Sequence, residues 1–138
     1  MGLDQKSVLV VDDELDILRV IKRSLEAGGG VNHVYAFTSP IEALEHFKLK
    51  YNNFALVLSD IGMPGMTGFE FIRRVRQINP TIKALLMSAF EFNNNERSSA
   101  LGSIMVDDFV RKPVSPRKLT RFVQGHIVKA GSYYNTNM

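Results

Sequence analysis

Four short apolar runs, each followed closely by a polar residue, are the feature that most constrains the fold of this chain. They span residues 8–11, 54–59, 82–87 and 109–111. Their length and their aliphatic and aromatic composition are typical of buried strands, and amphipathic stretches of helical period separate them. Strands that alternate with helices predict an α/β fold built on a parallel sheet.

A fifth strand is expected over residues 31–37, and three helix starts are marked by a hydroxyl residue. Ser39 and Ser115 each precede a proline, and Ser39 and Thr67 each precede a glutamate by three positions. A serine or threonine cap, a proline in the first turn and a glutamate at the third position are all typical of helix N-termini. The first helix is expected to end at the glycines of residues 28–30.

Behind Ser39, the helical spacing of Ile41, Leu44 and Phe47 predicts an apolar face turned to the core. The sequence is least informative over residues 91–106. Three consecutive asparagines there favour a turn over a helix interior, so we expect only a short helix near residues 96–101.

The polar residues that follow the expected strands are Asp12 and Asp13, Asp60, Ser88, and Lys112. The carboxyl ends of parallel strands meet at one edge of a sheet, where ligands of open α/β sheets bind. We therefore expect three carboxylates, a hydroxyl and an ammonium to meet in one pocket.

Carboxylates gathered in this way suit Mg²⁺, which prefers oxygen ligands and retains several waters. The expected ligands are Asp12, Asp13 and Asp60, with the backbone carbonyl of Gly62 as a further oxygen. A cation and an ammonium such as Lys112 together neutralise the charge that opposes attack by a carboxylate on a phosphoryl group.

Each residue also has a simpler interpretation. Asp12 and Asp13 could only favour the positive end of the following helix, and Asp60 could be a turn residue. Serine at the position of Ser88 is common at strand ends, and Lys112 could be a solvated loop lysine. Because all of them follow strands, the joint pattern favours a phosphoryl site.

Size and composition indicate one domain. The chain has 138 residues, 45% of them hydrophobic, and no cysteine. We expect a single domain over residues 1–138, with a core of about residues 7–129 and a frayed polar tail over 131–138. No apolar run is long enough for a transmembrane helix and no signal sequence is evident, so we expect a cytoplasmic protein without membrane contact.

Basic residues cluster near the C-terminal end, among them Arg117, Lys118 and Arg121. A nucleic-acid patch is one interpretation. Because no aromatic interleaving and no known binding motif accompany these residues, a solvated helix face is the preferred one, and direct nucleic acid binding is not expected.

The chain resembles the receiver domains of two-component response regulators, of the chemotaxis-regulator type. The resemblance runs from residue 7 to about residue 129. It rests on four segments: residues 8–14, 58–70, 87–89 and 107–113, which read VLVVDDE, LSDIGMPGMTGFE, MSA and DDFVRKP.

This resemblance implies a flavodoxin-like, doubly wound five-stranded sheet of order 2-1-3-4-5 with five helices, which is the strand order of a known receiver. It implies that Asp60 accepts a phosphoryl group from a histidine kinase or a histidine phosphotransfer protein. Asp12 and Asp13 would hold Mg²⁺ (or Mn²⁺), Ser88 would sense the phosphoryl group, and Lys112 would bind it. It also implies a cis bond between Lys112 and Pro113.

Phe109 stands at the switch-aromatic position of the family. When Ser88 moves toward a phosphoryl group it vacates space into which Phe109 can turn. The resemblance implies that this turn alters a partner-binding face made by the fourth helix, fifth strand and fifth helix, which in some receivers also pairs two copies. Plain core packing is the alternative interpretation of Phe109.

The expected function is therefore a phosphorylation switch rather than an enzyme, with only self-phosphorylation and slow autodephosphorylation of its own. It would act alone, as a phosphoshuttle, or as the receiver of a longer regulator. An aspartate-nucleophile phosphatase of the haloacid dehalogenase type is disfavoured, since neither Asp12 nor Asp60 has an aspartate two positions later. A binding module that no longer accepts phosphate is disfavoured because no required residue is missing.

Overall fold

The computed structural model describes residues 7–28, 30–31, 33–89 and 106–136, with side chains up to residue 127. The element order is β1 (Ser7–Val11), α1 (Leu15–Gly28), β2 (Val34–Phe37), α2 (Pro40–Lys50), the 3₁₀ turn η2 (Tyr51–Asn53), β3 (Phe54–Asp60), α3 (Gly68–Ile78), β4 (Lys83–Ser88), β5 (Asp108–Arg111) and α5 (Pro116–Thr136).

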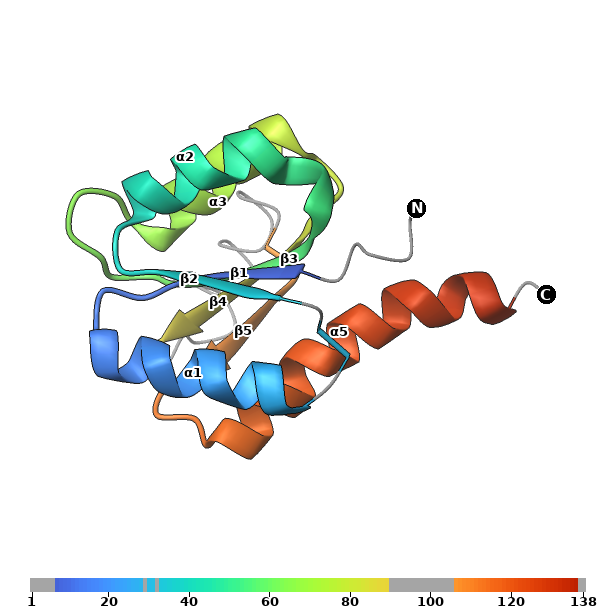
Figure 1. Cartoon of the computed structure of the whole chain (residues 1–138). Helices are drawn as coiled ribbons and strands as arrows, with labels where there is room; N and C mark the ends of the chain where they lie inside the picture. Colours follow the sequence, from blue (N-terminus) through green and yellow to red (C-terminus); the bar gives the residue numbers. More distant parts are fainter. Residues whose placement is uncertain (1–6, 29, 32, 90–105, 137–138) are drawn as a thin grey trace, which may run out of the picture.

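The five strands form one parallel sheet in the order β2-β1-β3-β4-β5, and helices cover both faces (Figure 1). This confirms the predicted α/β fold and strand order. Four α-helices lie in the described part of the chain. The fourth of the five expected helices, like the short helix predicted near residues 96–101, falls outside the described residues.

Two apolar layers hold the helices to the sheet. On one face α2 and α3 pack against side chains such as Leu9, Val57 and Leu86. On the other face α1 and α5 pack against Val10, Leu58 and their neighbours. The central strands β1 and β3 are buried on both sides, which is why they read as continuous apolar runs rather than as alternating ones.

The predicted helix starts are confirmed. Ser39 Oγ accepts a hydrogen bond from the Glu42 backbone N–H at 3.2 Å, and Thr67 Oγ1 accepts one from Glu70 at 3.1 Å. Each cap satisfies one of the N–H groups that a helix leaves unpaired in its first turn. The loops that lead from β1, β2, β3 and β5 into the following helices all lie along the carboxyl edge of the parallel sheet.

One local expectation differs from the structure. Ile41 is 55% exposed, because Ala43 rather than Ile41 joins Leu44 and Phe47 in the core. The backbone of residues 131–136 belongs to α5, and the fraying of the tail stays a prediction. None of the helices in the described part of the chain is both long and apolar enough to cross a membrane.

His46 on α2 is a polar group placed among aromatic rings. Its ring centroid lies 4.8 Å from that of Tyr35, 5.4 Å from Phe37 and 5.9 Å from Phe54. Its Nε2 atom is buried without a hydrogen-bond partner among the described residues. Burial, and then the charge of Lys50, lower the pKa of His46 below its ordinary value of 6.5.

The lowered pKa of His46 predicts acid sensitivity. The unfolded chain binds a proton at His46 more readily than the folded chain, so this residue costs stability as the pH falls through and below 6.5. We expect His46→Phe to lose less unfolding free energy than the native chain between about pH 7.5 and about pH 5, measured by urea denaturation. His33→Phe, at an exposed histidine, is the matched control; equal acid sensitivity of native chain and His46→Phe would contradict the prediction.

Candidate functional site

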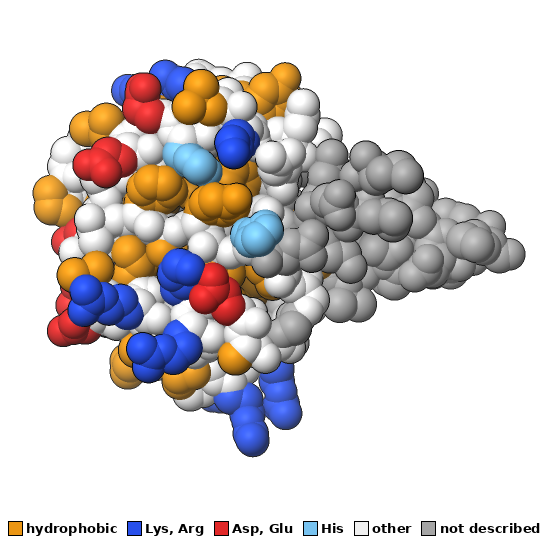
Figure 2. Space-filling model, in the orientation of Figure 1, with side chains coloured by type: hydrophobic (Ala, Val, Ile, Leu, Met, Phe, Trp, Pro, Cys, Tyr) orange, Lys and Arg blue, Asp and Glu red, His pale blue; other side chains and the backbone are white. Residues whose placement is uncertain are grey.

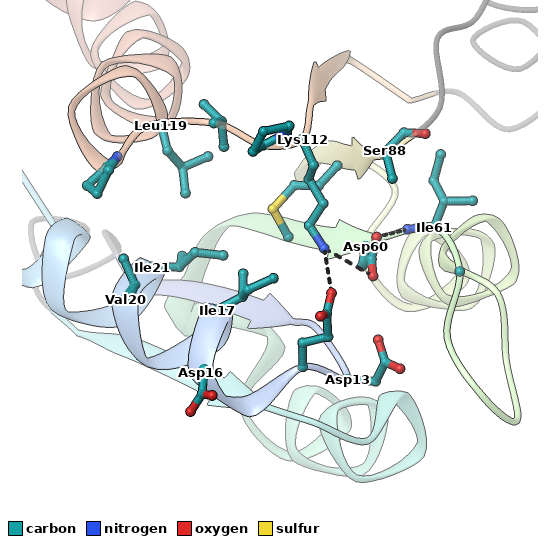
Figure 3. A pocket seen from close by; sticks show the side chains of 17 residues that line it. Asp13, Asp16, Ile17, Val20, Ile21, Asp60, Ile61, Ser88, Lys112 and Leu119 are labelled. Carbon is teal, nitrogen blue, oxygen red and sulfur yellow. Dashed lines mark hydrogen bonds and ion pairs between the residues drawn. The ribbon is translucent and has the colours of Figure 1, made fainter.

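The predicted site residues lie together at the carboxyl edge of the sheet. An open pocket of about 780 Å³ is lined there by Asp13, Asp60, Gly62, Ser88 and Lys112, and Figure 3 shows the Lys112 side chain extended toward Asp60. Asp12 follows β1 directly, Asp60 and Ser88 end β3 and β4, and Lys112 follows β5. Residues that are far apart in the chain thus converge because all the strands are parallel.

The Lys112 ammonium is the central charge of this site. Its Nζ atom lies 2.8 Å from Asp12 Oδ2, 3.3 Å from Asp60 Oδ2 and 3.7 Å from Glu14 Oε1. The predicted cis bond between Lys112 and Pro113 is confirmed. The Lys112 N–H donates to the Ser88 carbonyl at 2.7 Å, which ties the loop that carries the ammonium to the end of β4.

Asp12 is fully buried, which is unusual for a carboxylate. Its Oδ1 atom accepts a hydrogen bond from the Glu14 backbone N–H at 2.9 Å. Beside the ion pair with Lys112, its Oδ2 atom has no hydrogen-bond partner in the described part of the chain. A buried carboxylate oxygen left in this state is strongly disfavoured unless a cation balances it.

The carboxylates of Asp12, Asp13 and Asp60 also meet the requirements of a divalent cation. One oxygen from each lies within 4.8 Å of the others. Oxygens about 2.1 Å from a common Mg²⁺ lie at most about 4.2 Å apart, so this spacing needs little adjustment. Together with the full burial of Asp12, whose Oδ2 atom is balanced in this structure by the Lys112 ammonium, the donor set fits Mg²⁺.

Opposing influences act on the ionisation of the Asp60 carboxyl group. Burial is the largest influence and raises its pKa above the ordinary value of 3.8; the Lys112 charge opposes this and the Asp12 charge adds to it. For Lys112, burial lowers the pKa, but close contact with Asp12 and the charges of Asp12 and Asp60 raise it by more, so its net pKa lies above 10.5. Lys112 therefore carries a positive charge at neutral pH.

Ser88 and Phe109 lie on neighbouring strands. Ser88 is 2% exposed and lines the pocket, whereas Phe109 is partly buried against the core between the sheet and α2 and α3. In the β4–β5 ladder Phe109 pairs with Leu86 and Arg111 with Ser88. Paired residues in parallel strands point to the same face, so Phe109 and Ser88 lie on one face of the sheet, two positions apart.

Gly68 makes a close approach that our sequence analysis did not single out. A Cβ atom added there would lie 2.2 Å from the Asp60 carbonyl oxygen. The Gly68 N–H also donates to the Ile61 carbonyl at 2.8 Å. The first turn of α3 therefore rests directly on the backbone that carries Asp60, and only glycine permits this.

Two other features of the site were missed. Glu14 joins the carboxylates around Lys112, a role that its position next to Asp12 and Asp13 could have suggested. The pocket also continues from the carboxylates over an apolar floor. The apolar side chains of this floor come from α1, from the loop before α5 and from the start of α5: Ile17, Val20, Ile21, Val114, Pro116 and Leu119. The exposure of Val20, 50%, was not visible in the helical pattern alone.

Comparison with known proteins agrees with this geometry. Residues 8–124 match the response regulator receiver domain family, so the chain belongs to this family of two-component signalling domains. Among solved structures, a CheY-like receiver domain from Methanospirillum hungatei superimposes with a TM-score of 0.80 at 26% identity, covering 93% of this chain and 98% of that one. The chemotaxis protein CheY4 of Vibrio cholerae gives a TM-score of 0.76, also at 26% identity, covering 87% and 97%.

The curated relatives differ in length. An uncharacterized 14.6 kDa protein of Leptolyngbya boryana is 36% identical over 88% of this chain and 90% of its own length. The transcriptional regulatory protein ResD of Bacillus subtilis is 30% identical over 97% of this chain but only 54% of its own length. The chain covers only 18% of ARR21, a putative two-component response regulator of Arabidopsis thaliana, at 31% identity. The relatives thus include proteins of similar size and much longer ones.

The raised pKa of Asp60 predicts that its ionised carboxylate lowers the free energy of unfolding. The folded chain binds a proton at Asp60 more readily than the unfolded chain, so this contribution to stability decreases as pH rises from 3.8 through the raised pKa. Without divalent cations, we expect Asp60→Asn to be more stable than the native chain by about 1 kcal/mol at neutral pH, and by less near pH 4, in urea denaturation. Asp16→Asn, at an exposed residue of α1, is the control. Destabilisation by Asp60→Asn would contradict this account.

The close approach of Gly68 to the Asp60 carbonyl predicts that a side chain at this position lowers the free energy of unfolding. Gly68→Ala must push α3 away from the Asp60 carbonyl, so we expect a loss of about 1–3 kcal/mol in unfolding free energy. Gly125→Ala is the matched control, because nothing lies within 4 Å of a Cβ there. In the interior of α5 it should stabilise the protein by up to about 1 kcal/mol. Equal thermal shifts for the two variants would show that the contact is absent.

Proposed function

We propose that this receiver domain accepts a phosphoryl group on Asp60 and that Mg²⁺ supports the transfer. The observation that carries the proposal is the contact of one buried ammonium, that of Lys112, with two carboxylates, Asp12 and Asp60, at 2.8 and 3.3 Å. That arrangement gives the attacking carboxylate a positively charged partner from the chain itself. Phosphoryl transfer depends mainly on such positioning and charge neutralisation.

In the proposed reaction an Asp60 carboxylate oxygen attacks the phosphorus of a donor phosphohistidine. The new oxygen–phosphorus bond forms as the phosphorus–nitrogen bond breaks, and the imidazole leaves with its electron pair and takes a proton. The donor belongs to a histidine kinase or a histidine phosphotransfer protein. Attack of water on the acyl phosphate later returns phosphate and restores the Asp60 carboxylate.

The chain's own residues have distinct tasks in this proposal. Asp12, Asp13, Asp60 and the Gly62 carbonyl would hold the cation, which would supply positive charge to neutralise phosphoryl oxygens. Lys112 pairs with Asp60 before transfer and with the phosphoryl oxygens afterwards. Ser88 donates its hydroxyl hydrogen bond to the same oxygens.

The output of the switch is proposed to pass through Phe109. Because Ser88 and Phe109 lie on the same face of adjacent strands, movement of Ser88 toward the phosphoryl group opens space for the Phe109 ring. This rotation would change the face made by β5 and α5, where a downstream protein would bind. We also propose that the chain is a single domain and acts in the cytoplasm, either alone or as the receiver of a longer regulator.

The apolar floor beside the carboxylates gives the donor a place to dock. Ile17, Val20 and Ile21 on α1 line the pocket that holds Asp13 and Lys112, and Val20 is 50% exposed. A donor histidine on a helix must approach within bonding distance of Asp60, so its helix would cover this floor. Burial of these side chains in the complex would contribute on the order of 1.5–3 kcal/mol for each one that is fully covered.

The proposal predicts Mg²⁺-dependent labelling of one residue. Incubation with acetyl phosphate and Mg²⁺ should add a single phosphoryl group to the native chain, measured by intact-protein mass spectrometry. Asp60→Asn should remain unlabelled, and Lys112→Ala should be labelled at least about tenfold more slowly, a loss of about 1.4 kcal/mol in transition-state stabilisation. Asp16→Asn controls for loss of an acidic side chain near the pocket.

Other outcomes would contradict the proposal in separate ways. Labelling of Asp60→Asn equal to that of the native chain would remove Asp60 from its role. Equal labelling with Mg²⁺ and with excess chelator would remove the cation. Continuous release of phosphate from a small ester, in place of single labelling, would support a phosphatase.

A further inference from the structure

The two edges of the sheet differ in a way that phosphoryl transfer does not explain. One edge strand is β5, whose sequence is Asp-Phe-Val-Arg. Its first and last residues, Asp108 and Arg111, are charged. At the other edge, β2 reads Val-Tyr-Ala-Phe and carries no charge, proline or glycine. Proteins commonly protect strand edges with charge, proline or a bulge, because an open edge is a template for another strand. The β2 edge has none of these protections within the strand.

The backbone of β2 presents hydrogen-bonding groups along this edge. The carbonyls of His33 and Phe37 accept hydrogen bonds from β1, at 2.9 and 3.1 Å. In a parallel ladder a residue directs its N–H and C=O to the same side, and the next residue directs them to the other. Val34 and Ala36 therefore direct their N–H and C=O groups away from β1, toward the open edge.

The surroundings of the edge form a shallow groove that carries charges of both signs. A groove of about 360 Å³ is lined by residues 33–37 and by Lys22 and Glu26 of α1. In Figure 2 hydrophobic side chains gather over β2, with a basic and an acidic side chain next to them on the α1 side. Lys22 and Glu26 lie one helical turn apart, paired at 2.6 Å, and their side chains are 42% and 46% exposed.

We propose that the β2 edge is a self-association surface, on which two copies of this chain pair their β2 strands antiparallel about a two-fold axis. Val34 of each copy would exchange backbone hydrogen bonds with Ala36 of the other, so that the two sheets become continuous. Tyr35 would face its symmetry mate at the axis. Most homodimers have this two-fold symmetry, in which the same surface is used on both copies.

The charges beside the groove favour a second copy over a foreign strand. The two-fold axis makes the two α1 helices antiparallel neighbours, so that Lys22 of one copy approaches Glu26 of the other, twice. A wholly acidic or wholly basic strand would match only one of these charges and oppose the other. The surface is thus complementary to itself in hydrogen bonding, apolar character and charge.

The small size of the surface sets the strength of the association. β2 has four residues, and an interface built on it and on part of α1 falls in the class of weak, transient contacts. The dimer should therefore form as protein concentration rises from the micromolar toward the submillimolar range. It does not require Asp60 to be phosphorylated, so it is independent of the proposed function.

Charge reversal tests the predicted approach of Lys22 to Glu26. Sedimentation velocity over a range of protein concentrations should show a monomer–dimer equilibrium for the native chain. Lys22→Glu and Glu26→Lys should each weaken dimerisation at least about tenfold, and the double variant, in which both charges are exchanged, should restore it. Arg117→Glu, on α5, makes the same change of charge at an exposed residue and should leave the dimer intact.

Amide hydrogen exchange tests the strand pairing itself and needs no variant. The amides of Val34 and Ala36 should become more protected as protein concentration rises, whereas those of Tyr35 and Phe37, which face β1, should not change. A monomer at every concentration would overturn the proposal. So would a dimer that withstands both single charge reversals, or one that leaves the Val34 and Ala36 amides unprotected, because it would use another surface.

Discussion

The ammonium of Lys112 is the contact on which the site depends. Three carboxylates, those of Asp12, Asp60 and Glu14, lie within 3.7 Å of its nitrogen, and Asp12 is fully buried. Negative charges at this density repel one another and are poorly solvated, so the fold supports them only with a cation in their midst. The Lys112 ammonium is this cation, and it comes from the loop after β5. The Lys112 backbone N–H bonds to the end of β4, and the bond to Pro113 is cis.

Burial of Asp60 works against the ionisation of its carboxyl group. It raises the pKa of Asp60 above 3.8, whereas the proposed reaction needs the ionised carboxylate. A divalent cation and a phosphoryl group would relieve this conflict, since each brings a charge or a bond that the protein alone lacks. Sites that bind ligands often trade stability for function in this way.

The carboxyl edge of the sheet and its two outermost strands, β2 and β5, present different chemical groups. At the carboxyl edge, short loops gather polar groups from four strands around one pocket, and the close packing of Gly68 on the Asp60 carbonyl fixes where α3 begins. Along its sides, β5 is bordered by charges and by the Asp108–His126 contact at 3.2 Å, while β2 is apolar. The proposed phosphoryl chemistry and the proposed pairing of two copies would thus use separate surfaces.

Much of the fold could be predicted from local sequence. The continuous apolar run of β1 fits a strand buried on both faces, and Ser39 and Thr67 form the caps that their spacing to Glu42 and Glu70 indicates. The side chains at the strand ends could be named because parallel strands bring their carboxyl ends together. Ile41 shows the limit of this reasoning: its helical spacing fits the core, but the angle at which α2 meets the sheet buries Ala43 instead.

The sequence by itself determined the order of elements, the parallel sheet and the residues gathered at its edge, since these follow from periodicity and from the direction of each strand. Only the tertiary structure decided which carboxylate is buried, how close Lys112 comes to each, and which edge of the sheet stays apolar and open. Those properties arise from distances between segments that are remote in the chain. Local pattern does not encode such distances, because they depend on how all the helices and strands pack at once.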